Sequence, residues 1–278
     1  MQRLNKNYVV ELGYEESDKV KVGTLEENPD LSSAERLVWD LEKIMDIAKI
    51  YNRKFYSDGY VIIKDFLNNN EVKNFENFLL NVYSKQLKIN LNKKNIHSII
   101  KKYEEDEIYN QLYAALKKFS KTKPFIDVSK KFIKLCKLIF NKHYKLIGAG
   151  MAIGINGSKR TAYEWHQEKP YYKSLSTMHF QFPILNSCNK KNGTMSVLVG
   201  SNKLGFIKKV NNKKLSKKSI NSFIPKNINK IKKQFSEKFI NMNLKDIVIF
   251  SENIIHKTNK NISNQVRFAG IVRLKKKD

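Results

Sequence analysis

The sequence predicts an α+β protein in which helices come first and antiparallel strands then form a β-barrel or jelly roll. Three observations predict this class. Apolar residues recur at helical spacing in several segments before residue 142, strand-like segments follow one another from Tyr144 onward, and no internal repeat is evident. Hydrophobic residues make up 41% of the 278 residues, which is enough for a sizeable core.

The first half of the chain carries the helical patterns. Residues 1–30 are polar and lack a clear period, so we expect an extended arm. Ser32 and Glu35 have the spacing of a capping box, which predicts a helix from there to about Tyr56. Residues 85–106 alternate Lys/Asn-rich and apolar pieces, as in a flexible lid or a poorly packed surface segment. Further helices are expected after the turn at 68–70, at about 107–120 and at about 126–142.

The second half carries the strand patterns. A strand at 60–63 is followed, after the helices, by strands at 146–155, 175–185, 194–199, 246–250 and 265–274. The Lys/Asn/Ser-rich residues 200–237 are expected to form a solvated loop with a short helix.

The net charge of +27 raises the question of a nucleic-acid partner. The excess is mostly Lys, mixed with Asn and Ile along the whole chain, which is typical of a compositional bias. Arg, the usual base reader, is sparse, so no nucleic-acid partner is expected. Two cysteines form no disulfide framework, and no apolar run is long enough for a membrane span. These features predict a cytoplasmic protein, and the sequence indicates no oligomeric state.

The stretch Trp165-His166-Gln167-Glu168 is the strongest indication of chemistry. In an extended segment, residues i and i+2 point to the same face, so His166 and Glu168 project together while Gln167 points away. These are two parts of the 2-His-1-carboxylate facial triad that binds non-haem Fe(II). The third ligand should be a second histidine near another strand end, and His256 follows the buried strand 246–250 in that way.

Arg267 lies eleven residues after His256, enough for a turn and a return strand. Its guanidinium could therefore fork two hydrogen bonds to the distal carboxylate of a cosubstrate held on the iron. An α-keto acid at the iron and a carboxylate at the arginine together specify 2-oxoglutarate.

Several segments, in order, resemble the phytanoyl-CoA dioxygenase family of Fe(II)/2-oxoglutarate oxygenases, over about residue 55 to the C-terminus. The matching segments are 55–62 with the helix after Asn70, 165–168, 192–194 leading to 200–203, and 246–250 through His256 to Arg267.

The resemblance implies a double-stranded β-helix (jelly-roll, cupin-like) core with the N-terminal helices packed on one sheet. It implies an arm and helix at 1–54 and a dioxygenase domain at 55–278. By resemblance, His166, Glu168 and His256 bind Fe(II), Arg267 binds 2-oxoglutarate and the Thr258 hydroxyl also bonds the cosubstrate. The implied reaction uses O₂ to hydroxylate a small, anionic metabolite, with release of succinate and CO₂.

Other residues around the motif have two interpretations. Lys169, Tyr171 and Tyr172 line a substrate entrance or pack at its rim, and Arg273, six residues after Arg267, contacts an anionic ligand or caps the strand. The other histidines favour structural roles: His179 as a satisfied histidine within a strand, with a cavity-facing position as the alternative, and His97 and His143 at the surface.

One position departs from the family, which normally has Asp where this chain has Glu168. Glu is also a hard oxygen ligand, and its presence argues against a halogenase of this type. Two competing functions remain at this stage. One is a nucleic-acid dealkylating oxygenase, because Arg267 and Arg273 have the spacing of the paired arginines in AlkB-type enzymes. The other is a binding protein with a disabled iron site.

Overall fold

The computed structural model describes residues 33–102, 119–158, 161–169, 176–208 and 224–277. Two antiparallel sheets lie opposite each other: a five-stranded sheet in the order β1-β6-β3-β8-β2 and a three-stranded sheet in the order β5-β4-β7. The strands are β1 Tyr60–Ile63, β2 Tyr144–Gly154, β3 Thr177–Ile184, β4 Met195–Leu198, β5 Glu237–Phe239, β6 Ile247–Ser251, β7 His256–Thr258 and β8 Arg267–Lys276. The expected α+β class with antiparallel sheets is confirmed.

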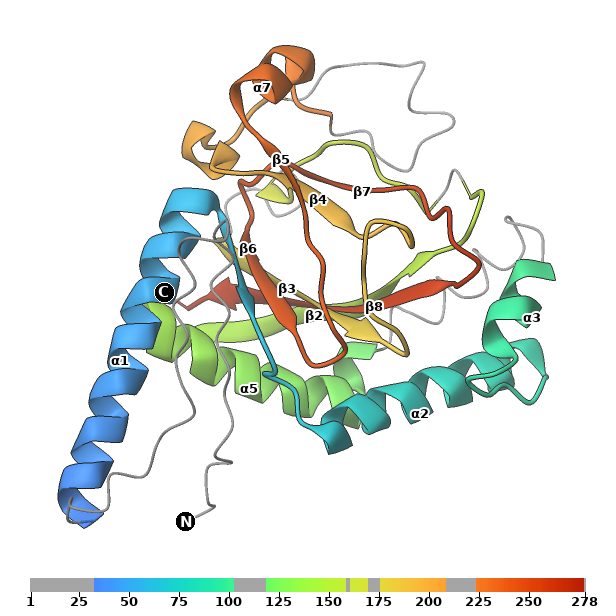
Figure 1. Cartoon of the computed structure of the whole chain (residues 1–278), viewed down its shortest axis with the longest axis horizontal. Helices are drawn as coiled ribbons and strands as arrows, with labels where there is room; N and C mark the ends of the chain where they lie inside the picture. The colour runs from blue at the N-terminus through green and yellow to red at the C-terminus, as the bar shows by residue number, and fades with distance from the viewer. Residues whose placement is uncertain (1–32, 103–118, 159–160, 170–175, 209–223, 278) are drawn as a thin grey trace.

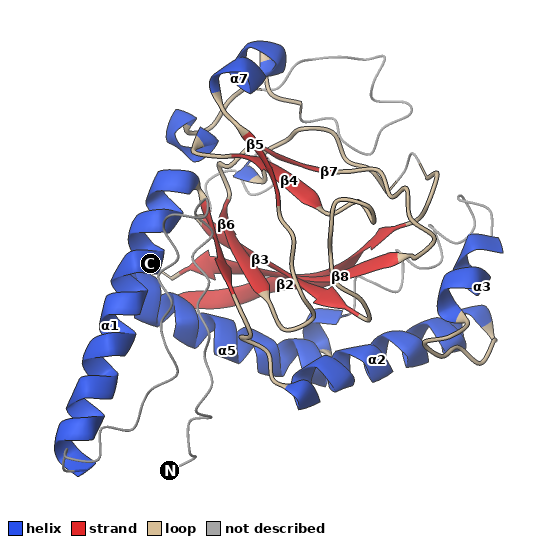
Figure 2. Ribbon diagram, in the orientation of Figure 1, coloured by secondary structure: helices blue, strands red, loops and turns tan. Residues whose placement is uncertain are grey.

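The helices lie mainly along one side of the larger sheet, as Figures 1 and 2 show for α1, α2 and α5. The α-helices are α1 Ser33–Asp58, α2 Asn69–Leu87, α3 Ile96–Lys102, α5 Lys123–Phe140 and α7 Ile228–Gln234, and two 3₁₀ turns are η1 Phe119–Lys121 and η2 Ser201–Leu204. Asn68 and Glu71 form a capping box that begins α2. The left-handed Gly59, with φ of 86°, follows the end of α1 at Asp58, close to the expected end near Tyr56.

Side-chain alternation along the larger sheet produces two separate cores. One face packs against the helices: Phe180 of β3 stacks on Phe132 of α5 with ring centroids 4.3 Å apart, and Phe182 meets Phe75 of α2 at 4.7 Å. The opposite face of the same sheet packs against the smaller sheet through a second cluster that includes Phe250 and Val197. The N-terminal helices therefore pack on one sheet, as expected, and leave the other face to form the interior between the sheets.

The segment 85–106 differs from the expectation, as far as the structure describes it. Residues 96–102 form helix α3, and Ile96 and Ile100 have no exposed surface, so this part is neither a lid nor poorly packed. His97 is also not a surface residue, because it is half-buried and its Nδ1 accepts a hydrogen bond from the Val266 N–H at 3.1 Å. The surrounding Lys and Asn residues concealed two apolar positions at i, i+4 spacing.

The remaining expected elements are a helix near 126–142, the insertion at 200–237, the N-terminal arm and the helix at 107–120. The helix expected near 126–142 is α5, and His143 is exposed as expected. The described part of the insertion at 200–237 contains the 3₁₀ turn η2 and the expected short helix, α7, and residues 209–223 lie outside the described residues. The N-terminal arm with Ser32, and nearly all of the helix expected at 107–120, lie outside the described residues. No helix in the described ranges is long and apolar enough to cross a membrane.

Candidate functional site

The two histidines of the predicted metal site lie on segments that pair with each other. The His166 N–H donates to the His256 carbonyl at 2.8 Å, and the His256 N–H donates to the His166 carbonyl at 3.0 Å. The Lys169 N–H extends this pairing to the Glu252 carbonyl at 2.9 Å. A short turn after β6 delivers His256, as predicted, and the pairing brings the two imidazole centroids to 4.2 Å.

Side chains alternate along 166–168 as the i, i+2 argument predicts. Gln167 points away from the two candidate ligands and is fully buried. Its Nε2 donates to the Gly205 carbonyl at 2.7 Å and the Asn253 carbonyl at 2.6 Å, and its Oε1 accepts from the Ile207 N–H at 2.9 Å. Gln167 therefore fixes the backbone that carries His166 and Glu168.

His166, Glu168 and His256 come together at one point. Each contributes one ligand atom, and these atoms all lie within 4.8 Å of one another. Glu168 Oε1 lies 3.8 Å from His166 Nε2 and 3.7 Å from His256 Nε2. Two atoms that bind one transition metal at ~2.1 Å lie at most ~4.2 Å apart, so Glu168 is close enough to each histidine to share an ion with it.

Backbone carbonyls fix which nitrogen of each histidine can bind a metal. His166 Nδ1 lies 2.7 Å from the Glu164 carbonyl and His256 Nδ1 lies 3.2 Å from the Ile254 carbonyl. A carbonyl only accepts, so each Nδ1 carries the hydrogen and each neutral ring keeps its lone pair on Nε2. Burial lowers the pKa of His256, and the neighbouring His166 lowers it further, so the neutral ligand form is favoured.

Glu168 is held as a carboxylate. Burial alone would raise its pKa, but Arg273, the two histidine ligands and His179 together lower it well below the usual value. The Oε2 atom lies 3.8 Å from Arg273 Nε and 3.9 Å from His179 Nδ1. His179 therefore faces the site, which was the less favoured interpretation of the sequence. Burial lowers its pKa to about 3.

A hydrogen-bonded chain that the sequence did not reveal lies beside His179. Its Nε2 is 2.9 Å from the Thr177 hydroxyl, which donates to Glu252 Oε2 at 2.7 Å. Glu252 Oε1 in turn pairs with Lys169 Nζ at 3.0 Å. Lys169, expected either to line a substrate entrance or to pack at its rim, lies in this ion pair. An acid directly after a buried strand was the only indication of Glu252 in the sequence.

Arg267 begins β8 and is buried, with 1% of its surface exposed. Its Nε, Nη1 and Nη2 have no hydrogen-bond partner among the described residues. Burial lowers its pKa, and the Cys188 thiol, a weak acceptor beside the guanidinium, acts in the opposite direction together with Tyr163. A buried cation without an oxygen acceptor is costly, so this arrangement fits a carboxylate ligand that supplies the missing acceptors.

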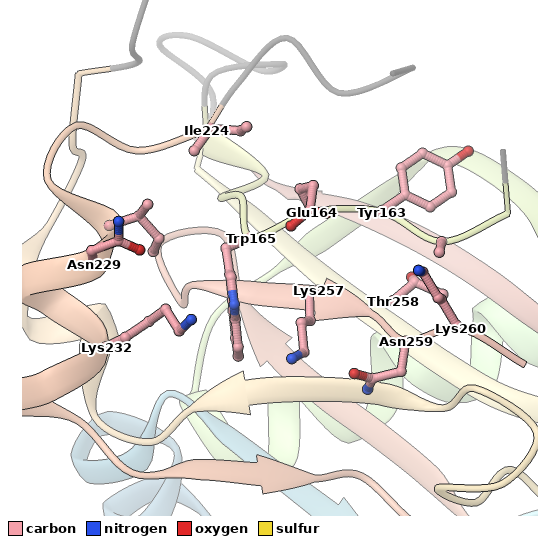
Figure 3. Close-up of a pocket in the computed structure, with 12 residues that line it drawn as sticks. Tyr163, Glu164, Trp165, Ile224, Asn229, Lys232, Lys257, Thr258, Asn259 and Lys260 are labelled. Atoms are coloured by element: carbon pink, nitrogen blue, oxygen red, sulfur yellow. The ribbon is translucent and has the colours of Figure 1, made fainter. Parts of the chain in front are cut away.

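Thr258 lies two residues after His256 on β7 and is half-buried. It borders a cavity of about 370 Å³ with Tyr163, Trp165 and Lys257 (Figure 3), whose lining includes neither the three candidate ligands nor Arg267. Lys257 Nζ lies 4.5 Å from the centre of the Trp165 ring in this cavity. The predicted contact of Thr258 with a cosubstrate stays a prediction. Tyr171 and Tyr172 lie outside the described residues.

The interior face of β2 leaves space beside the candidate ligands. Gly148 pairs in register with Arg273, and Gly150 pairs with Ile271. A Cβ added at either glycine would meet no atom within 4 Å in the described structure, so this wall is open.

A family model matches this chain. The model described as "Phytanoyl-CoA dioxygenase (PhyH)" matches residues 55–269. The chain belongs to the phytanoyl-CoA dioxygenase family. The resemblance inferred from the motifs is therefore confirmed, and the chain is an Fe(II)/2-oxoglutarate-dependent oxygenase. No curated protein matches it in sequence.

Solved structures share the fold at low identity. The epimerase SnoN, in complex with Fe³⁺, α-ketoglutarate and nogalamycin RO, has a TM-score of 0.60 at 10% identity, over 83% of this chain and 84% of that one. The carbocyclase SnoK has a TM-score of 0.57 at 14% identity, over 82% and 83%. EctD from S. alaskensis, with 2-oxoglutarate and 5-hydroxyectoine, has a TM-score of 0.52 at 14% identity, over 81% and 74%.

Proposed function

We propose that this chain is a dioxygenase that hydroxylates a small, anionic metabolite, consuming O₂ and 2-oxoglutarate and releasing succinate and CO₂. His166, Glu168 and His256 are the proposed Fe(II) ligands, and Arg267 is the proposed anchor for 2-oxoglutarate. The proposal includes a double-stranded β-helix core, supported by the two facing antiparallel sheets, and a domain beginning at residue 55.

One observation carries the proposal. Three ligand atoms of the types that non-haem iron uses converge within 4.8 Å, on the same interior that holds the buried Arg267 without an acceptor among the described residues. The metal site and the unsatisfied guanidinium each call for a ligand, and a keto acid with a second carboxylate satisfies both.

The residues of the chain have separate tasks in this reaction. When bound, iron and 2-oxoglutarate supply the oxidising chemistry that couples decarboxylation to insertion of oxygen into a C–H bond. The two histidines and Glu168 bind from one side and so leave other coordination positions open. Arg267 orients the cosubstrate through its distal carboxylate. Burial of all four side chains excludes bulk water from the reacting atoms.

The walls of the interior indicate the size and charge of the substrate. The open space over Gly148 and Gly150 lies beside Glu168 and its neighbour Arg273, which supports a small molecule next to the metal ligands. Arg273, a cation with 28% of its side chain exposed, supports an anionic group on that molecule. Lys169 contributes less to this argument, because it is paired with Glu252.

The test is a screen of small metabolites for substrate-dependent succinate formation by the Fe(II)-loaded protein. Matched sets of anionic and neutral compounds test the charge of the substrate. Alkylated DNA is included as the candidate substrate of the competing function. We expect succinate release with one or more anionic metabolites and none above background with DNA. Release with DNA alone would replace the proposal with a nucleic-acid dealkylase.

Variants separate the ligand roles from general damage. Ala at His166, at His256 or at Arg267 should abolish turnover. His143→Ala removes the same imidazole from an exposed position outside the proposed ligand set and should leave turnover unchanged. Unaltered turnover in any of the first three variants would remove that residue from its proposed role.

A further inference from the structure

The two oxygens of Glu168 face different groups. Oε1 lies toward the histidine ligands, 3.8 Å from His166 Nε2 and 3.7 Å from His256 Nε2. Oε2 lies on the other side, 3.8 Å from Arg273 Nε and 3.9 Å from His179 Nδ1. One oxygen of the carboxylate therefore faces the proposed metal position, and the other faces the Arg273 guanidinium and the His179 ring.

The larger sheet places these two groups together. His179 of β3 is the direct cross-strand partner of Arg273 of β8, so their side chains stand next to each other on one face. Phe250 of β6 flanks His179 on one side, with ring centroids 5.3 Å apart, and Gly148 of β2 flanks Arg273 on the other. β8 is paired on both edges along this row, so the position of Arg273 is fixed by the sheet rather than by a loop.

A glutamate ligand needs such support more than a shorter acid would. Its carboxylate is connected through one more rotatable bond than that of aspartate, so more rotamer freedom is lost when it binds a metal. A contact that already holds the second oxygen removes part of this cost before the metal arrives. Partners of this kind orient metal ligands, and their removal typically lowers metal affinity about 10–100-fold.

We propose that Arg273 is a positioning residue that holds Glu168 Oε2, so that Glu168 offers the metal Oε1 as a single-oxygen ligand. This inference rests on the proposed metal site. It assigns to Arg273 a contact with the carboxylate ligand, beyond the substrate contact or strand cap expected from the sequence. The guanidinium acts through Glu168 and touches no reacting atom.

The test measures metal affinity without turnover. Co(II) is titrated into metal-free protein by calorimetry, without 2-oxoglutarate, for the wild type and for Arg273→Met. We expect Arg273→Met to weaken Co(II) binding about 10-fold. Lys276→Met removes the same charge from an exposed position at the end of the same strand and should leave the affinity unchanged. Wild-type affinity in Arg273→Met would overturn the inference.

A double-mutant cycle separates positioning from a general structural effect. Aspartate at 168 withdraws the carboxylate from Arg273, so Arg273→Met should cost less in the Glu168→Asp protein than in the wild type. Equal costs in both backgrounds would show that Arg273 does not act through Glu168. Arg273→Lys keeps the charge and covers the case in which the Met variant does not fold. It should bind Co(II) more weakly than wild type, by less than about 10-fold.

The same titrations keep this inference distinct from the proposed function. If wild-type protein binds no Co(II), or if His256→Ala binds it equally well, the metal site itself is wrong. If wild type binds Co(II) and His256→Ala does not, but Arg273→Met matches wild type, only the positioning role is wrong.

Discussion

Replacing Gly154 with Ala tests the position of Arg267 with a single methyl group. Gly154 is the direct cross-strand partner of Arg267. A Cβ at residue 154 would lie 3.0 Å from Arg267 Nε, 3.3 Å from Nη2 and 3.4 Å from the arginine Cβ. Ordinary contacts are about 3.5–4.0 Å, so the guanidinium must move by several tenths of an ångström. The backbone at Gly154 has no positive φ, so strain does not complicate the substitution.

The displacement should cost one good hydrogen bond to the cosubstrate carboxylate. A hydrogen bond to a charged group contributes about 1.5–3 kcal/mol, which corresponds to roughly 10-fold or more in affinity. The assay is calorimetric titration of 2-oxoglutarate into Co(II)-loaded protein. We expect Gly154→Ala to raise the Kd for 2-oxoglutarate about 10-fold and to leave Co(II) affinity unchanged.

Gly150→Ala is the matched control, because it lies on the same face of β2 and its Cβ would meet no described atom within 4 Å. It should leave the Kd for 2-oxoglutarate unchanged. Unaltered 2-oxoglutarate binding in Gly154→Ala would refute the assignment of Arg267 as its anchor, and an equal loss in Gly150→Ala would refute the argument from local contact.

Three further predictions concern the support of the site. Arg267→Met should raise the free energy of unfolding of the ligand-free protein by about 1–4 kcal/mol, because it removes a buried cation that has no oxygen acceptor. The same variant should lose the stabilisation that 2-oxoglutarate gives the wild type. Thermal unfolding with and without 2-oxoglutarate measures both effects. Gln167→Leu should weaken Co(II) binding, measured by titration, because it removes three hydrogen bonds that hold the 166–168 backbone; wild-type affinity would contradict this. Burial and Lys101 lower the pKa of His97 in the folded state, so the unfolded chain binds a proton more readily and stability should fall as pH drops below about 6.5; His97→Gln should reduce this fall in melting temperature between pH 7 and 5.

Short-range patterns in the sequence were sufficient to identify the three candidate ligands. The i, i+2 spacing of His166 and Glu168 fixes their common side in any extended backbone, and the buried strand before His256 fixes where its turn begins. The structure adds the reason that they meet, since residues 166 and 256 are hydrogen-bonded neighbours. That pairing joins positions ninety residues apart, and no local pattern contains it.

Long-range contacts also explain what the sequence did not reveal. Thr177 and Glu252 form part of the network under His179 only because β3 and β6 are neighbours in the larger sheet. His97 in a Lys/Asn-rich segment looks like a surface residue until its bond to the Val266 backbone is known. Side chains whose roles depend on sheet order cannot be assigned from spacing along one segment.

The most direct test of the central claim is an anaerobic absorption spectrum of the protein with Fe(II) and 2-oxoglutarate. One iron held by His166, Glu168 and His256 and chelated by 2-oxoglutarate should give a weak charge-transfer band in the visible region. The band should be absent in His256→Ala and present in His143→Ala. No band in the wild type, together with its appearance in Glu168→Asp, would contradict the account and indicate a binding protein whose iron site is disabled.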